Sequence, residues 1–414
     1  MSTQAKTTQP QQVPVPRYAW VILAVVFLAS LSAAMNYLKP PGIASTLIPW
    51  YEIGIDQFGL LMSVFSITGV VLALPAGLIL SKIGVKKAVL ASVGFCFVGA
   101  IVGIFAETFP VLLFSRFLEG IGESVVFVAA PAAIVAWFPY QRQGVAFGVW
   151  SICMPAGSFI MLNTAPHLTA AFGWQSVWVM GAIISGVAFI LYALFFRMPI
   201  RSVSEQGASV MGETDDEQPS LSSLLQVLKN RDVWLAGLIF GCFNFVVATV
   251  IGSYYPYFLE TQLQTPNALA SSISSIPELV SIIGGPIIGL IADRVGRRKP
   301  LLMVGCLVLG VAGALVFMAS SAWMAAGLMF VFGAIAPLVT AGVRLVIPEV
   351  TGENHLKVGM GNAVLSFFLN LVGLIGPIVA GIVVVHLGWA EIGFFLFIPL
   401  FACAFVASTI IRAK

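Results

Sequence analysis

Long apolar segments recur along the whole chain, and they restrict its possible folds more than any other feature. A helix crosses the hydrocarbon core of a bilayer with about 20 consecutive apolar residues, and this chain contains many runs of that order. Charged residues make up only 9% of the 414 residues, whereas a soluble domain carries about 25%. We therefore expect an all-α membrane protein with twelve transmembrane helices. The predicted spans are residues 18–39, 57–81, 87–106, 111–138, 144–170, 174–197, 232–258, 270–292, 299–319, 323–348, 357–385 and 388–411.

Lysine and arginine occur on alternate loops between the predicted spans. They lie before span 1, after spans 2, 4, 6, 8 and 10, and at the end of the chain. The loops on the other side carry acids such as Glu52, Asp56 and Glu107, and they contain no arginine. Because cytoplasmic loops are enriched in lysine and arginine, we expect both termini in the cytoplasm. The chain is expected to be a multi-pass protein of the cell membrane, either an inner or a plasma membrane.

The predicted spans fall into two halves of six. The only long polar stretch between spans is 198–231, and its composition predicts a flexible cytoplasmic linker. Polar residues before the first span predict a disordered tail. The expected organisation is a cytoplasmic tail at 1–17, a six-helix bundle at 18–197, the linker at 198–231, a second six-helix bundle at 232–411 and a short cytoplasmic tail at 412–414.

A short motif occurs once in each half. GLILSKIGVKK begins at Gly77 after span 2, and GLIADRVGRR begins at Gly289 after span 8. Glycines permit a tight turn and close helix approach, and Asp293 could accept hydrogen bonds that latch the cytoplasmic side. Plain membrane anchoring explains the basic residues, but not Asp293 or the glycine spacing. The first copy has Ser81 instead of the acid, so we expect a weaker latch there. The predicted gating residues are Gly77, Ser81, Gly84, Gly289, Asp293, Arg294, Gly296 and Arg297.

Three ionisable residues lie inside the fourth span, at Arg116, Glu119 and Glu123. At 3.6 residues per turn, Glu123 lies about 20° around the helix from Arg116, and Glu119 about 60°, so all three share one face. A charge at the bilayer centre costs about 2.5–3.5 kcal/mol on insertion scales, so such groups face protein or water. One interpretation is an Arg116–Glu119 pair that neutralises itself and only stabilises the helix. It leaves Glu123 unexplained, and the other interpretation is a substrate and proton site in a wet cleft.

Other polar groups in the spans are further candidates. Lys39 follows Asn36 at the end of span 1, and it either extends to the outer surface or, if span 1 continues past Pro40, lies deeper and binds an anion together with Arg116. In the second half, Asn244 and Tyr254 could contact substrate. Glu278 is either a second proton site or a partner across the contact between the halves.

These motifs resemble the major facilitator superfamily, and the resemblance covers the chain from Arg17 onward. It implies two six-helix bundles that rock about a central cavity, lined by spans 1, 4, 7 and 10, with spans 2, 5, 8 and 11 between the halves. The segment from Arg116 to Glu123 (RFLEGIGE) is similar to the anion:cation symporter branch, and the general pattern also resembles cyanate- and nitroimidazole-type carriers. The resemblance implies that Arg116 and Glu123 serve anion binding and proton coupling. That branch usually has an acid at the position of Asn36, so any coupling here must rest on Glu123 or Glu119.

The expected function is secondary active transport of a small organic or inorganic anion by alternating access, coupled to a proton or another cation. The alternative is a proton-driven exporter of hydrophobic or cationic compounds. An enzyme is not expected, because the sequence has no Ser/His/Asp set, metal-ligand spacing or phosphate loop. The basic residues form no stripe for nucleic acid, and the five cysteines lack paired spacing. We expect no cofactor or metal; the partners are the substrate, the coupling ion and the lipid bilayer. The family resemblance implies a monomer.

Overall fold

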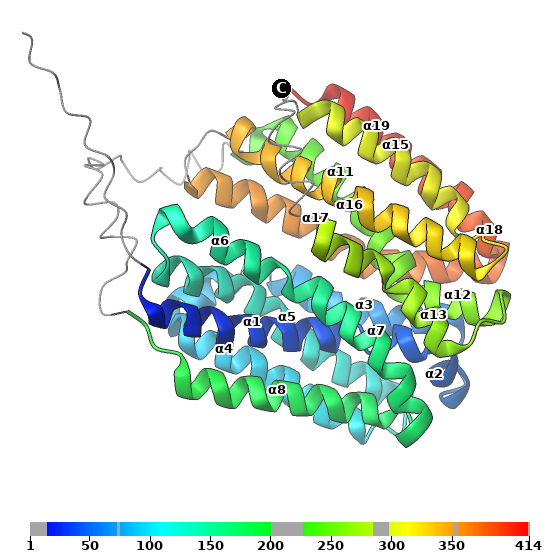
Figure 1. The fold of residues 1–414 in the computed structure, drawn as a ribbon, viewed down its shortest axis with the longest axis horizontal. Helices are drawn as coiled ribbons and strands as arrows, with labels where there is room; N and C mark the ends of the chain where they lie inside the picture. Colours follow the sequence, from blue (N-terminus) through cyan, green and yellow to red (C-terminus); the bar gives the residue numbers. More distant parts are fainter. Residues whose placement is uncertain (1–14, 73–74, 200–226, 285–297, 352–354, 413–414) are drawn as a thin grey trace, which may run out of the picture.

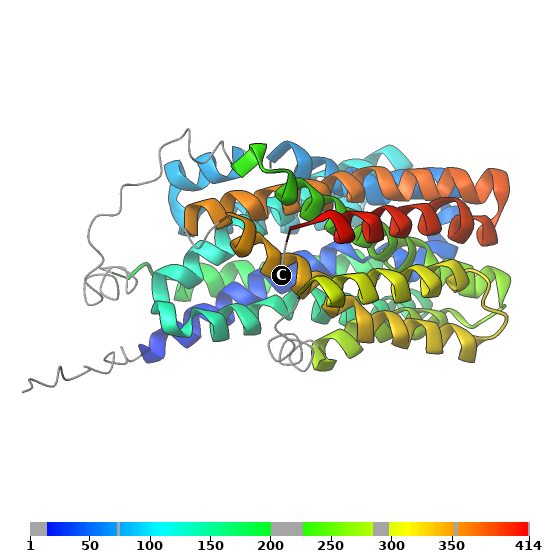
Figure 2. The ribbon, with the colours of Figure 1, turned by 90° about the horizontal axis from the view of Figure 1, so that it is seen from above.

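The computed structural model describes residues 15–72, 75–199, 227–284, 298–351 and 355–412, and within them the regular structure is helical. Two bundles lie side by side with their helices running in nearly the same direction (Figures 1 and 2). The first bundle contains α1 (Arg17–Tyr37), η1 (Pro41–Ile43), α2 (Ala44–Trp50), α3 (Ile55–Leu72), α4 (Pro75–Ile104), α5 (Phe109–Trp137), α6 (Tyr140–Ser151), α7 (Cys153–Phe172) and α8 (Gln175–Phe195). The second contains α11 (Arg231–Val246), η2 (Val247–Tyr254), α12 (Tyr255–Gln262), α13 (Asn267–Ser274), α15 (Arg298–Val316), α16 (Ala322–Thr351), α17 (His355–Leu387), α18 (Trp389–Ile392), η3 (Gly393–Phe397) and α19 (Ile398–Ile410).

The helices agree with the predicted spans. Nine helical segments among the described residues are long and apolar enough to cross a membrane. The other three predicted spans fall on α11–η2–α12, on the helices that begin with α13, and on α15, whose apolar part is Leu302–Val316. A π-helical segment interrupts the first of these, and residues 285–292 of the second lie outside the described residues. The all-α fold predicted from the sequence is confirmed.

One boundary differs from the prediction in a way that affects the site. Span 1 was expected to end at residue 39, but the apolar helical segment continues from Arg17 to Trp50. The chain turns after Tyr37, passes through the short helix η1 and continues as α2. Polar residues near position 39 therefore lie within the span and not at its end.

The first copy of the repeated motif contains the expected turn. Gly84 has φ +77° and ψ 159°, a backbone conformation that interrupts α4 and strains residues with a Cβ atom. Gly77 and Ser81 lie in α4, but the structure does not describe their side-chain surroundings. The remaining predicted gating residues lie outside the described residues: Gly289, Asp293, Arg294, Gly296 and Arg297. Most of the predicted linker, 198–231, also falls there.

The two bundles meet through α3 against α17 and α7 against α13. These are predicted spans 2, 11, 5 and 8, the four that the family resemblance assigned to this contact. Glycines permit the close approach, since a Cβ atom at Gly59 of α3 would lie 2.5 Å from the backbone oxygen of Pro377. Small residues allow membrane helices to pack in this way without a hydrophobic driving force.

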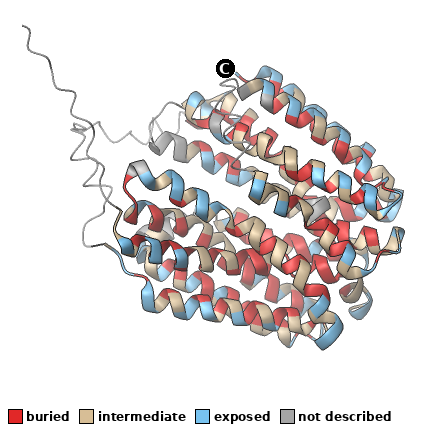
Figure 3. Ribbon diagram, viewed as in Figure 1, coloured by how far each residue is buried: buried red, intermediate tan, exposed pale blue. Residues whose placement is uncertain are grey.

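The contact is tightest at one end of the molecule. We call the end where α1 begins and α19 finishes the terminal end, and the end with α2 and α12 the distal end (Figure 1). Each bundle has an apolar core of its own, and a third core near the distal end includes residues of both bundles, such as Phe58 and Trp178 with Tyr254 and Ala380. Helix segments coloured as buried lie on both sides of the contact between the bundles there (Figure 3).

Hydrogen bonds reinforce the distal contact. The Asn163 side chain of α7 donates to Ser275 Oγ over 2.9 Å and accepts from Ser272 Oγ over 2.8 Å. Asn267 of α13 donates to the carbonyl oxygen of Gly42 over 3.2 Å. The Tyr254 hydroxyl reaches the carbonyl oxygen of Ile55 over 3.2 Å. We call the bonds of Asn163 and Asn267 the distal clasp.

The glycine contact between α3 and α17 gives a stability prediction. Gly59→Ala would force the two helices apart, and overpacking of this kind costs about 1–3 kcal/mol. The variant should therefore melt at a lower temperature than the wild type in detergent. The matched control is Gly148→Ala on α6, where a Cβ atom meets no neighbour within 4 Å, and alanine favours a helix over glycine by about 1 kcal/mol. Equal melting temperatures for the two variants would contradict this account.

Candidate functional site

The charged residues of α5 form the centre of the candidate site. This helix packs against α1, α3 and α4, so its middle turns lie inside the first bundle. Arg116 and Glu119 have none of their side-chain surface exposed, and Glu123 is half-buried. The expectation that Arg116 faces a wet cleft is therefore not met in this structure. The reason lies in the end of α1.

Arg116 binds the last two carbonyl groups of α1. Its Nη1 atom donates to the backbone oxygen of Asn36 over 2.5 Å, and Nη2 donates to that of Tyr37 over 2.8 Å. In a continuing helix, these oxygens would accept from the N–H groups of residues 40 and 41. Both positions are proline and have no N–H group. Arg116 therefore satisfies two helix-end carbonyls that the Pro40–Pro41 pair cannot satisfy.

Glu119 holds both buried cations. Its Oε2 atom accepts from Arg116 Nη1 over 2.6 Å, and Oε1 accepts from Lys39 Nζ over 2.5 Å. The Arg116–Glu119 pair expected from the sequence is present, but it is part of a group of three. We call Lys39, Arg116 and Glu119 the charged triad.

Lys39 does not extend to the surface, because its side chain is fully buried. Its Nζ atom lies 5.3 Å from the centre of the Trp178 ring, a favourable position for a cation over an aromatic face. The side chain fits because residue 181 is glycine: a Cβ atom there would lie 2.6 Å from Lys39 Nζ and from Asn36 Oδ1. The alternative in which span 1 continues and Lys39 lies deeper is the one that the structure supports.

The charged triad has one positive charge more than it has negative charges. Two polar atoms at the charged triad, Arg116 Nε and Asn36 Oδ1, are buried and have no hydrogen-bond partner among the described residues. Glu123 lies about 10 Å along α5 from Arg116, at a rise of about 1.5 Å per residue. It makes no hydrogen bond or ion pair within the part of the chain that the structure describes. The site thus combines excess buried positive charge with an unengaged carboxyl group on the same helix.

The side chains of Asn36, Asn244 and Tyr254 donate their hydrogen bonds to atoms outside the charged triad. The Asn36 amide donates to Ser32 O over 2.7 Å and to Ser185 Oγ over 2.9 Å, so it joins α1 to α8. Asn244 is half-buried and bonds Phe240 O of its own helix over 2.7 Å. Tyr254 is buried at the contact between the bundles, with its hydroxyl 2.7 Å from Pro377 O.

Glu278 is half-buried in the helix that follows Ser275, beside the buried Pro277. Like Asn244 and Tyr254, it belongs to the second bundle. Among the described residues, no hydrogen bond or ion pair joins these three to the charged triad. The structure therefore brings together Arg116, Lys39 and Glu119, with Asn36 beside them through its backbone and Glu123 farther along α5.

Sequence reasoning missed three features of the site. Phe65 of α3 places its ring 4.4 Å from the guanidinium carbon of Arg116, and Trp178 and Gly181 of α8 surround Lys39. No local sequence signal marks these residues. The adjacent prolines at positions 40 and 41 were a usable signal. They leave the carbonyl groups of Asn36 and Tyr37 without N–H donors inside a membrane span.

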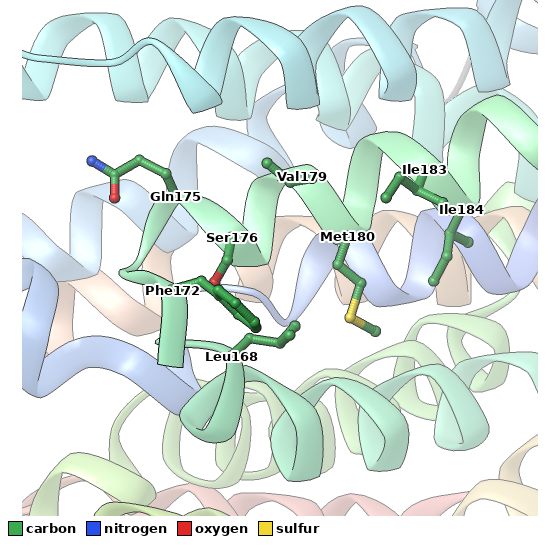
Figure 4. Close-up of a pocket in the computed structure, with 8 residues that line it drawn as sticks. All are labelled: Leu168, Phe172, Gln175, Ser176, Val179, Met180, Ile183 and Ile184. Atoms are coloured by element: carbon green, nitrogen blue, oxygen red, sulfur yellow. The ribbon is translucent and has the colours of Figure 1, made fainter. Parts of the chain in front are cut away.

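The structure also has an external groove that contains none of the predicted site residues. It lies between α7 and α8 and measures about 520 Å³. Figure 4 shows its mainly apolar lining by Leu168, Phe172, Gln175, Ser176, Val179, Met180, Ile183 and Ile184. The described residues contain no cluster of three or more potential metal ligands.

Comparisons with known proteins agree on one family. The family model for the Major Facilitator Superfamily matches residues 21–264 and 238–413. The probable galactarate/D-glucarate transporter GarP of Escherichia coli K12 is 25% identical over 311 residues, which cover 67% of this chain and 68% of that protein. The hexuronate transporter of Bacillus subtilis is 24% identical over 387 residues, which cover 88% and 89%.

A solved structure supports the same fold. A bacterial homologue of the human lysosomal transporter Spinster, in an inward-facing and unoccupied conformation, aligns with a TM-score of 0.79. The alignment covers 96% of this chain and 98% of that one, at 16% sequence identity. At this identity the likeness concerns the fold alone.

The contact of Arg116 with α1 gives the prediction for this site. Arg116→Lys keeps the charge, but one ammonium group cannot reproduce the planar fork that reaches two carbonyls and Glu119. Since hydrogen bonds to charged groups contribute about 1.5–3 kcal/mol each, the variant should lose at least about 2 kcal/mol of stability. Thermal unfolding in detergent measures this loss. Arg142→Lys, at an exposed position of α6, is the control and should melt like the wild type; an equally stable Arg116→Lys protein would contradict the assignment.

Proposed function

The chain belongs to the major facilitator superfamily of membrane transporters, and we propose that it carries a small carboxylate anion together with a proton. The substrate class is that of sugar acids, such as galactarate, glucarate and hexuronates, which are the substrates named for its relatives. The proposed mechanism is symport by alternating access in the cell membrane, with both termini in the cytoplasm.

The observation that carries this proposal is the excess positive charge of the charged triad. Lys39 and Arg116 are fully buried and share one carboxylate. A buried charge without a partner costs several kcal/mol, so a second negative group would stabilise this site. A carboxylate is a suitable ligand because it can accept from Lys39 Nζ and from the unpaired Arg116 Nε.

Glu123 is the proposed proton carrier. Both oxygens of Glu119 are engaged by cations, whereas the half-buried Glu123 has no such partner in the described part of the chain. With Glu123 ionised, the charged triad and Glu123 together are neutral. Entry of one anion and one proton leaves this group neutral, while entry of either alone places a net charge in a region of low dielectric constant. This charge balance couples the two movements.

The same charge balance disfavours the alternative function. An exporter of lipophilic cations would need to bring positive charge toward Lys39 and Arg116, which already exceed the carboxylate between them. Like charges at close range repel strongly in a dry interior. We therefore favour an anion as the substrate.

Alternating access requires that the distal end opens during transport. The bonds of the distal clasp that join the two bundles connect neutral amide, hydroxyl and carbonyl groups, while the bond from Asn267 to the Glu260 carboxylate stays within the second bundle. Each neutral hydrogen bond contributes only about 0.5–1.5 kcal/mol net. These bonds are weak enough to break and re-form in each cycle. We propose that the clasp closes the outer side of the protein in the state observed here.

Reconstitution into liposomes tests the proposed substrate class and coupling. The wild type should accumulate labelled glucarate, galactarate or a hexuronate when the outside is made acidic, and collapse of the gradient should abolish accumulation. Glu123→Gln should lose at least about 90% of this accumulation, since coupling of the proton through the carboxyl is removed. Glu107→Gln, at an exposed loop position, is the control and should accumulate like the wild type. Full gradient-driven accumulation by Glu123→Gln would show the coupling assignment to be wrong.

Labelling of an introduced cysteine tests the role of the distal clasp. The reporter is Ser271→Cys, at a buried position of α13, in a background where the exposed Cys403 is replaced by serine. Adding Asn163→Leu removes the bonds to Ser272 and Ser275 and should raise the rate of labelling by an impermeant maleimide outside intact cells several-fold. The control is Gln175→Leu at the start of α8. An unchanged rate with Asn163→Leu would contradict the closing role.

A further inference from the structure

Glu119 is the one acidic member of the charged triad, and it contacts both of the cations that the proposed function assigns to the substrate. Its carboxylate is fully buried and bridges Lys39 Nζ and Arg116 Nη1 at 2.5 and 2.6 Å. Both atom pairs are close enough for charge-assisted hydrogen bonds, the kind that the carboxylate of a ligand would make with the same cations. The side chain thus occupies, from within the protein, the position between two cations that a substrate carboxylate would need.

We propose that the Glu119 carboxylate is an internal substitute for the substrate carboxylate; this inference rests on the proposed function. It pairs with Lys39 and Arg116 when the transporter is empty, and it releases Lys39 when an anionic substrate arrives. The empty transporter can then change conformation without an unpaired cation in its interior. Glu119 is a positioning residue for net transport, and it is not the proton carrier.

The geometry indicates which cation exchanges partners. Arg116 is fixed, because its two Nη atoms also donate to the backbone oxygens of Asn36 and Tyr37. Lys39 Nζ has Glu119 as its hydrogen-bond partner and the Trp178 ring beside it. An ammonium group on a flexible stem can rotate between two carboxylates, whereas the guanidinium cannot do so without freeing two buried carbonyls.

The position of Lys39 also connects this exchange to the distal clasp. Lys39 lies in the short joint between α1 and η1, where the chain is not α-helical. Three residues later, the backbone oxygen of Gly42 accepts the hydrogen bond from Asn267 of the second bundle. When Lys39 leaves Glu119, the joint loses the side-chain contact that holds it to α5. The same joint leads to Gly42, which is the acceptor of the distal clasp in the first bundle.

Replacement of the Glu119 carboxylate should affect net uptake and substrate exchange differently. In Glu119→Gln, the empty transporter contains two buried cations without a carboxylate, whereas the loaded one has the substrate carboxylate. Net uptake requires the empty form to change conformation, and exchange of internal for external substrate does not. Since loss of one partner of a buried pair is strongly unfavourable, net uptake should fall at least about tenfold while exchange stays within about threefold of the wild type.

A binding experiment tests the substitution without knowledge of the substrate. Acetate provides a free carboxylate that can fill the position vacated in Glu119→Ala, whose shorter side chain leaves space between the two cations. Acetate should raise the melting temperature of purified Glu119→Ala by several degrees more than that of the wild type, with chloride at equal ionic strength as the control. The double variant Lys39→Met/Glu119→Ala, which lacks one cation as well, should respond less than Glu119→Ala to acetate.

The outcomes separate this inference from the proposed function. Stabilisation of Glu119→Ala by acetate, together with exchange that survives the loss of net uptake in Glu119→Gln, supports the substitution. Failure of acetate to stabilise the folded variant, or an equal loss of exchange and net uptake, overturns it even if the wild type transports sugar acids. If the wild type transports no sugar acid in either mode, the proposed substrate class fails, and the acetate result alone decides whether Glu119 substitutes for an anion.

Discussion

The bonds from Arg116 to the last two carbonyl groups of α1 determine the rest of the site. Pro40 and Pro41 leave these carbonyls without donors in a region where water is excluded, and the Arg116 guanidinium supplies both hydrogen bonds. A buried guanidinium needs a counter-ion, which Glu119 provides one helical turn along α5. The free oxygen of Glu119 then holds Lys39, which the same proline-induced joint places inside the span.

The need to satisfy two carbonyl groups at the end of α1 thus places charged residues inside the bundle, and these residues form the candidate binding site. Satisfying two carbonyls would need only one cation and one carboxylate. The addition of Lys39 leaves the charged triad with a positive charge that its own groups do not balance, beside an unpaired Arg116 Nε atom. The glycine at position 181 and the Trp178 ring accommodate this lysine. A protein that needed only stability would gain nothing from such a group, since apolar residues of similar volume are often as stabilising as a buried ion pair.

The sequence predicted the architecture well because hydropathy, charge placement and the repeated motif all act over long stretches of chain. The helical periodicity of α5 also placed Arg116, Glu119 and Glu123 on one side of the helix, and the turn expected at Gly84 is present with a positive φ angle. Two features of the site could not be predicted in this way. The exposure of Arg116 depends on how α1 ends, and the distal clasp depends on Asn163 and Ser272, which are ordinary polar residues far apart in the chain. Hydropathy also gave span 1 an end at residue 39, because it does not distinguish a joint inside a span from a loop outside it.

The central claim is that the buried positive charge accepts a carboxylate anion only together with a proton. Isothermal titration calorimetry of the purified protein with a sugar acid, repeated in buffers of different ionisation enthalpy, measures the number of protons taken up per anion bound. Near neutral pH, the account predicts an uptake of about one proton in the wild type and almost none in Glu123→Gln, since one carboxyl group carries the proton. Anion binding by the wild type without proton uptake, or with the same uptake in both proteins, would contradict it.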